Sequence, residues 1–276
     1  MLEDPQASVD LTGLIDLHIH SAPDIRPRKL NDVEVARAAR AAGLKAVLIK
    51  SHVTITADRA SIAEKVVPGV RVFGAVVLNY EVGGLNLTAV ETALKLGARE
   101  VFLPTFSARG SGRRPEGIVV IDDAGDLLPV VLDILKLVAE RDVILGTGHL
   151  SVPEIILVVK AARRLGVTKV LITHPEGRLI AMPADVQREL ASDGACFERC
   201  YESALADPDL GVAGLARRIR QVGPASTVIS TDLGQAENPS PVDGFRSYII
   251  GLMAEGITWR EIRVMAEENP TRLLGL

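Results

Sequence analysis

Two histidines separated by one residue, His18 and His20, are the strongest chemical signal in the sequence. They end an apolar segment, residues 13–20, that is short enough and rich enough in Leu and Ile to form a buried strand. Because side chains alternate between the faces of a strand, both imidazoles project to the same side, where they can reach one metal ion. The pair alone is equally compatible with two hydrogen-bonded core histidines. Its meaning depends on what the fold places beside it.

The other three histidines and one aspartate each follow an apolar segment of strand length. The segments and residues are 44–49 with His52, 143–145 with His149, 169–172 with His174, and 227–229 with Asp232. In a closed barrel of parallel strands, the carboxyl ends of all strands surround one face, where active sites of such barrels lie. The first and last strands are neighbours in such a barrel. We therefore expect Asp232 beside His18 and His20.

Strand-like and helix-like segments alternate along the chain. The strand-like segments are 13–20, 44–49, 70–78, 100–103, 143–145, 169–172, 194–197 and 227–229. The helix-like segments are 32–42, one from residue 56 or 58 to Pro68, 86–96, 129–140, 153–165, 183–192, 209–221, 244–255 and 259–268. Strict alternation predicts parallel βαβ units, and eight units predict a (β/α)8 TIM barrel with extra C-terminal helices. A doubly wound open sheet is the alternative, but no G-x-G-x-x-G motif follows the first strand.

Length and composition bound the interpretation. The 276 residues fit one barrel, and with no evident linker we expect residues 1–276 to form one domain. The chain is 47% hydrophobic with few aromatic residues, which indicates an aliphatic core. A net charge of −4 with interspersed signs argues against polyanion binding. We expect a small-molecule substrate, no nucleic-acid or membrane partner, and a homo-oligomer.

The chain ends and the cysteines indicate the compartment. The first ten residues are acidic and polar, and no run of about 18 apolar residues occurs, so we expect a cytoplasmic protein. The two cysteines, Cys196 and Cys200, are too few for a disulfide framework and lack the second pair of a structural zinc site. We interpret them as reduced, structural thiols.

One long segment, residues 106–128, has no periodicity and is rich in Gly and Arg. A loop of this length inside a compact domain is more often a lid or binding loop than filler, although a disordered flap is the alternative. Arginines can pair with a substrate carboxylate or phosphate, but surface arginines are usually only solvated. The candidates are Arg109, Arg113 and Arg114 in this loop, and Arg26 after the first strand.

Four features of the sequence are similar in order and spacing to the metal-dependent amidohydrolase superfamily. They are Asp16-Leu17-His18-Ile19-His20, single histidines on the fifth and sixth strands, Ser230-Thr231-Asp232, and the closing Asn269-Pro270-Thr271-Arg272-Leu273-Leu274-Gly275-Leu276. The resemblance covers nearly the whole chain and implies a (β/α)8 barrel that binds one or two divalent ions, usually zinc. It implies that His18, His20 and Asp232 hold the first ion. His149 and His174 would hold a second ion or face the substrate.

The sequence departs from this superfamily at the fourth strand. Members with two metals commonly bridge them with a carboxylated lysine or a glutamate there, but here the strand ends in Leu103-Pro104-Thr105. Either the site holds one ion, or Lys50 and His52 supply an unusual substitute. We favour one ion. The alternative role for Lys50 is to neutralise acids in the barrel mouth.

The chemistry expected of such a site is hydrolysis by activated water. A bound ion lowers the pKa of its water to near neutrality and polarises a carbonyl or phosphoryl oxygen. Asp232 is placed to orient that water and shuttle its proton, and His149 or His174, if not a ligand, can donate to the developing oxyanion. Residues near the seventh strand that can support the ligands are Glu198, Arg199 and Cys200.

The leading hypothesis is a metal-dependent hydrolase of a C–N or C–O bond, in an amide, lactone or ester, of a small anionic molecule. Three alternatives stay open. They are a phosphoesterase of the histidinol-phosphatase-like type, a decarboxylase of the same superfamily, and a non-catalytic barrel that retains a structural or sensing metal.

Overall fold

Eight parallel strands form the centre of the molecule. The structure, a computed structural model, describes residues 9–111 and 115–276. The strands are β1 (Ile15–His20), β2 (Ala46–Lys50), β3 (Arg71–Val77), β4 (Glu100–Phe102), β5 (Ile144–Gly146), β6 (Val170–Thr173), β7 (Cys196–Cys200) and β8 (Thr227–Ser230). Each strand pairs in parallel with the next, in the order β1 to β8.

The first and last strands meet just beyond the end of β8, and this contact closes the barrel. The Asp232 backbone N–H donates to the His18 carbonyl at 2.8 Å, and the His20 N–H donates to the Leu233 carbonyl at 2.8 Å. The buried Asp16 carboxylate accepts from the Thr231 hydroxyl at 2.6 Å, which ties β1 to the same segment. The predicted (β/α)8 barrel is confirmed.

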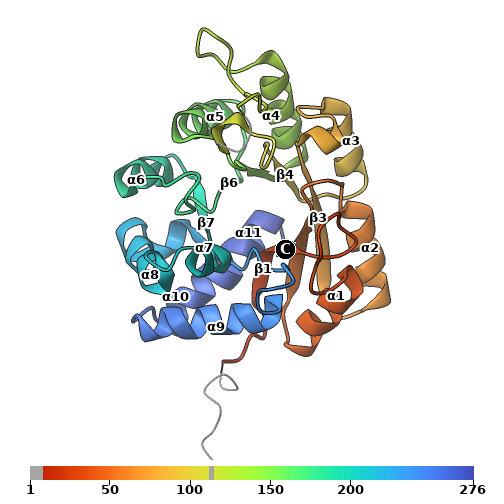
Figure 1. Cartoon of the computed structure of the whole chain (residues 1–276), viewed down its shortest axis with the longest axis vertical. Helices are drawn as coiled ribbons and strands as arrows, with labels where there is room; N and C mark the ends of the chain where they lie inside the picture. The colour runs from red at the N-terminus through yellow and green to blue at the C-terminus, as the bar shows by residue number, and fades with distance from the viewer. Residues whose placement is uncertain (1–8, 112–114) are drawn as a thin grey trace, which may run out of the picture.

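Helices surround the strands (Figure 1). They are α1 (Asp32–Ala41), α2 (Ala57–Val66), α3 (Leu87–Lys95), α4 (Pro129–Arg141), α5 (Val152–Arg164), α6 (Ala184–Ser192), α7 (Tyr201–Ala206), α8 (Gly211–Val222), α9 (Pro241–Ala254), α10 (Trp259–Arg263) and α11 (Asn269–Leu274). Residues at the N-termini of two helices favour a helix start there. Asn31 forms a capping box with Glu34 at α1, and Pro129 occupies the first turn of α4. Two large apolar clusters pack between helices and strands, and a third fills the barrel interior.

The structure differs from the sequence prediction mainly around the ends of elements. α7 follows β7 directly and was not predicted. The predicted helix 259–268 is α10 continued by a π-helical turn, Val264–Glu268, which leads into α11. The predicted loop 106–128 contains a short 3-10 turn, Arg109–Ser111, and isolated bridges. Within the described ranges, no helix is both long and apolar enough to cross a membrane.

Candidate metal centre

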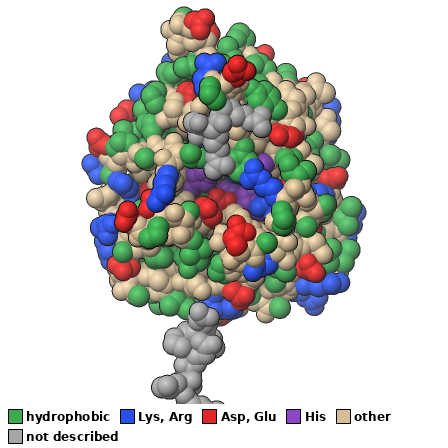
Figure 2. Space-filling view, in the orientation of Figure 1, with side chains coloured by type: hydrophobic (Ala, Val, Ile, Leu, Met, Phe, Trp, Pro, Cys, Tyr) green, Lys and Arg blue, Asp and Glu red, His purple; other side chains and the backbone are tan. Residues whose placement is uncertain are grey.

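The histidines gather at the bottom of a hollow at the carboxyl ends of the strands, where Figure 2 shows them beneath charged side chains. This cavity has a volume of about 730 Å³. Its lining includes His20, Lys50, His52, His149, His174 and Asp232. The structure therefore brings the residues predicted from five different strands to one face of the barrel.

Three of these residues converge on a single point. The Nε2 atom of His20 lies 2.9 Å from Asp232 Oδ1, and the Nε2 atom of His18 lies 3.1 Å from the same oxygen. Both imidazoles are buried, whereas the Asp232 side chain is 12% exposed and reaches the cavity. Two imidazole nitrogens and one carboxylate oxygen are a ligand set that zinc binds, with ligand distances of about 2.0–2.2 Å.

The outer nitrogens of both histidines are held by acceptors. Glu198 Oε2 lies 2.9 Å from His18 Nδ1, and the Lys50 carbonyl lies 3.1 Å from His20 Nδ1. Because these partners accept hydrogen bonds, each Nδ1 carries a proton and each Nε2 is the nitrogen directed toward an ion. Carboxylates and carbonyls orient metal-binding histidines in this way in many proteins. The residues present therefore fit a divalent ion.

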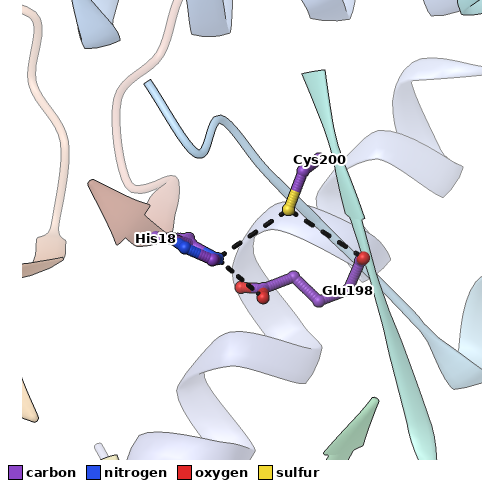
Figure 3. Close-up of side chains that lie close together, drawn as sticks. All are labelled: His18, Glu198 and Cys200. Carbon is purple, nitrogen blue, oxygen red and sulfur yellow. Dashed lines mark hydrogen bonds and ion pairs between the residues drawn. The ribbon is translucent and has the colours of Figure 1, made fainter. Parts of the chain in front are cut away.

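Figure 3 shows Glu198 and Cys200 extending from β7 toward His18. The Cys200 sulfur lies 3.8 Å from His18 Nδ1, and the three side chains form a second group that can hold a metal. Glu198 already accepts a hydrogen bond from that nitrogen, so we infer that Glu198 orients the His18 ring. Cys196 and Cys200 are both buried free thiols.

Electrostatics distinguish the two histidines in the metal-free protein. Burial lowers the pKa of His18, but the charges of Asp232 and Glu198 outweigh it and raise this pKa to about 9. Burial lowers the pKa of His20 to about 4. Burial also raises the pKa of Asp232, yet His18 and His20 hold it well below its usual value. At neutral pH the centre thus contains a carboxylate, a neutral His20 and a protonated His18.

Lys50 places a second cation at the same point. Its Nζ lies 3.0 Å from His18 Nε2 and 4.4 Å from the centre of the Phe102 ring, and its side chain is buried. The charge of Lys50 opposes a proton at that nitrogen, and it opposes a metal ion there for the same reason. The predicted role of Lys50 in place of a bridging ligand stays a prediction.

The remaining histidines lie around this centre. His149 and His174 face each other with their Nε2 atoms 3.1 Å apart. His52 Nδ1 lies 2.8 Å from the Thr105 hydroxyl, and its ring stacks on His20 at 4.8 Å between ring centres. None of these three belongs to a group of three metal-binding side chains among the described residues. Their roles at a second ion or toward the substrate stay predictions.

Backbone strain marks two residues of the site. His174 has a φ of 26° and Asp232 a φ of 54°, which is the left-handed region that residues other than glycine rarely adopt. Such conformations persist only where the surroundings enforce them, and they concentrate at functional sites.

Glu100 was not predicted as a site residue. It lies fully inside the barrel, and neither of its carboxylate oxygens has a hydrogen-bond partner in the described part of the chain. Burial and the nearby charge of Glu198 raise its pKa well above the usual value. The sequence does contain a signal for it. Glu100 lies two residues before Phe102, so both side chains share the inward face of a strand that is expected to be buried on both faces.

The predicted arginines do not all reach the cavity. Arg26 lines it, whereas Arg109 is exposed and is not part of its described lining. Arg113 and Arg114 lie outside the described residues. Arg199 is fully buried beside Glu176 and Gln187, away from the cavity lining.

Comparison with known proteins identifies one matching family and several similar structures. The model of DUF6282, a family of unknown function, matches residues 13–198. No curated protein matches the sequence. An amidohydrolase from Pseudomonas aeruginosa has a similar structure, with a TM-score of 0.67, 13% identity, and 95% of each chain covered.

Two further solved structures are similar. A protein from Pseudomonas putida, assigned as a 2-pyrone-4,6-dicarboxylic acid hydrolase, has a TM-score of 0.66 and 16% identity over 97% of this chain and 98% of its own. A 2,6-dihydroxybenzoate decarboxylase from Rhizobium has a TM-score of 0.56 and 12% identity over 96% of this chain and 99% of its own. The predicted resemblance to the amidohydrolase superfamily is thus confirmed for the fold.

Proposed function

This chain belongs to the DUF6282 family, a family of unknown function, and we propose that it is a metal-dependent hydrolase. Its reaction is the cleavage of a C–N or C–O bond, in an amide, lactone or ester, of a small anionic molecule. We further propose one ion for each chain, most suitably zinc. The similar structures include one assigned as a hydrolase of a dicarboxylic acid, which supports an anionic substrate.

One observation carries this proposal. The Nε2 atoms of His18 and His20 converge on Asp232 Oδ1 at 3.1 and 2.9 Å, at the base of an open cavity. Both outer nitrogens are hydrogen-bonded, so the ligand atoms are oriented before an ion arrives. Structural metal sites are closed by their protein ligands, whereas this ligand set opens onto a cavity large enough for a small molecule.

The ion, when bound, supplies a Lewis acid that polarises the scissile carbonyl and lowers the pKa of water. The chain supplies the proton transfers. Asp232 is ionised at neutral pH and reaches the cavity, so it can accept the proton of an attacking water and return it to the leaving group. His149 and His174 line the same cavity and can donate a hydrogen bond to the oxyanion.

Metal content and turnover test the proposal together. Elemental analysis of the purified protein for zinc, iron and manganese should give about one ion per chain, and iron must be included because two histidines and one carboxylate also suit iron(II). Turnover of a panel of carboxylate-bearing lactones, esters and amides should disappear on chelation and return with metal. Chelator-resistant turnover would contradict the metal mechanism. Release of CO2 from hydroxybenzoates without hydrolysis would favour a decarboxylase.

Asp232→Asn tests the proton transfer. Asparagine keeps the shape and an oxygen near both histidines, but it is not basic. We expect most of the ion to remain and kcat to fall by roughly 100-fold or more, the scale of a lost general base. Loss of the ion would make Asp232 mainly a ligand, and kcat within a few-fold of wild type would place the base elsewhere.

A further inference from the structure

We propose that Arg26 is the subsite for a carboxylate group of the substrate. It lies in the segment between β1 and α1 and lines the cavity. This inference rests on the proposed function only in taking the cavity as the substrate site. The residues that hold the ion are not needed for it.

Arg26 is an exposed residue whose guanidinium lies on a stack of side chains at the cavity wall. Its central carbon lies 4.3 Å from the centre of the Phe106 ring. The other contacts of that ring include His52, which stacks on it with ring centres 3.9 Å apart and an interplanar angle of 28°. A guanidinium that lies on an aromatic face keeps its N–H donors free at its edge, where they can bind a carboxylate in a bidentate manner.

The charge of Arg26 is not neutralised by the protein, unlike that of the other arginines described in the lining. Arg28 pairs with Asp24 at 3.0 Å, and Arg178 pairs with Asp207 at 3.2 Å. Among the described residues, no carboxylate lies within ion-pair distance of the Arg26 guanidinium. An arginine that lies on an aromatic ring at a cavity wall, with no described carboxylate within ion-pair distance, favours an anionic ligand.

The stack also relates this subsite to the metal centre. The ring of His52 stacks on Phe106, with ring centres 3.9 Å apart, and also on His20, with ring centres 4.8 Å apart. Arg26 and the ligand His20 are therefore separated by two stacked rings along one wall of the cavity. A small molecule with a carboxylate at Arg26 can place a second functional group beside His20 and Asp232. The substrate class is a carboxylic acid whose scissile bond is remote from that carboxylate.

Binding of isophthalate, an aromatic dicarboxylate without a hydrolysable bond, tests the subsite by calorimetry. Arg26→Met keeps an unbranched side chain on Phe106 but removes the charge, and we expect its Kd for isophthalate to rise about 10-fold or more. Lys29→Met is the matched control, because it removes one charge from the same segment at a residue outside the cavity lining. We expect its Kd to stay within about two-fold of wild type.

The His18→Ala/His20→Ala variant separates this inference from the proposed function. In that variant the Arg26 effect on isophthalate binding should persist, even though no ion is held. If isophthalate binds through Arg26 but no substrate is ever turned over, the subsite stands and the proposed function fails. Equal Kd values for wild type and Arg26→Met, equal losses in Arg26→Met and Lys29→Met, or no binding of isophthalate by wild type at millimolar concentration would each overturn the subsite.

Discussion

His18 contacts three charged side chains of the centre, and these charges set its pKa. One nitrogen faces Glu198, and the other faces both Asp232 and Lys50. Two carboxylates favour a proton on this imidazole, and Lys50 opposes it. In the metal-free protein a proton therefore occupies the nitrogen that an ion needs.

This arrangement predicts how metal affinity depends on pH. The pKa of His18 is about 9, so below pH 9 the ion must displace a proton, and affinity should rise up to about 10-fold for each pH unit as pH increases toward 9. His20, with a pKa of about 4, is already neutral and adds no dependence near pH 7. Calorimetry at pH 7 in buffers of different ionisation enthalpy should show release of about one proton from the protein.

Glu198→Gln provides the control for that measurement. It removes a charge that raises the pKa of His18 but retains an oxygen that accepts from Nδ1. The rise in affinity should then level off at a lower pH than in wild type. Affinity that does not change between pH 6 and 8 in wild type would show that His18 is not protonated before the ion binds.

At the scale of elements, the junction of β1 with the segment after β8 both closes the barrel and builds the site. His18 and His20 come from β1, and Asp232 comes two residues after the end of β8. Gly234 allows this approach: with φ at +134°, a Cβ there would lie 1.7 Å from the His20 carbonyl oxygen. The backbone of β1 can therefore approach this segment only because residue 234 has no side chain.

Gly234→Ala should damage stability and metal binding together. The added methyl must push β1 away from the segment after β8, so we expect a loss of about 3 kcal/mol or more in the free energy of unfolding and a lower metal content. Urea unfolding and elemental analysis measure the two effects. Gly97→Ala is the matched control, since Gly97 also has a positive φ, +98°, but open space at its Cβ. We expect about 1 kcal/mol there and a full complement of metal. Equal losses in the two variants would show that strain alone, and not the β1 contact, explains the effect.

The pattern of strands and helices explains why much of this fold was predictable from the sequence. The eight strands and their order were predictable because buried parallel strands are continuous apolar runs that alternate with capped helices. The placement of His18, His20 and Asp232 followed, since barrel closure alone makes β1 and β8 neighbours. The conformations that depend on tertiary contacts, such as α7 and the π-helical turn at Val264–Glu268, leave no periodic signal.

Two features of the site were beyond sequence reasoning for a different reason. The proximity of Lys50 to His18 depends on barrel register, because a residue on β2 reaches a residue on β1 only at one relative height. Among the described residues the Glu100 carboxylate has no hydrogen-bond partner. This depends on what surrounds it, including Gly146, where a Cβ would lie 2.7 Å from Oε1. Neither distance can be read from spacing along the chain.

At the scale of the whole molecule, the proposed ion joins parts of the chain separated by more than 200 residues. Its ligands would be two residues near the start of the barrel, His18 and His20, and one near its end, Asp232. Few backbone hydrogen bonds join the two ends of the described barrel. β1 pairs with β2 over several residues, whereas on its other side it bonds the backbone of Asp232 and Leu233, just beyond β8. An ion that binds only the closed barrel therefore stabilises the whole fold by mass action.

Thermal unfolding tests this coupling between the ends of the barrel. At an ion concentration 1,000 times its Kd, binding adds about 4 kcal/mol to stability, which corresponds to a rise in Tm of about 10 °C for a domain of this size. We expect chelation to lower the Tm of wild type by that scale and to leave His18→Ala/His20→Ala unchanged. The Tm of the double variant should lie below that of chelated wild type, because both imidazoles are buried and the hydrogen bond of His18 to Glu198 is lost. A chelator effect of the same size in wild type and double variant would place the stabilising ion at another site.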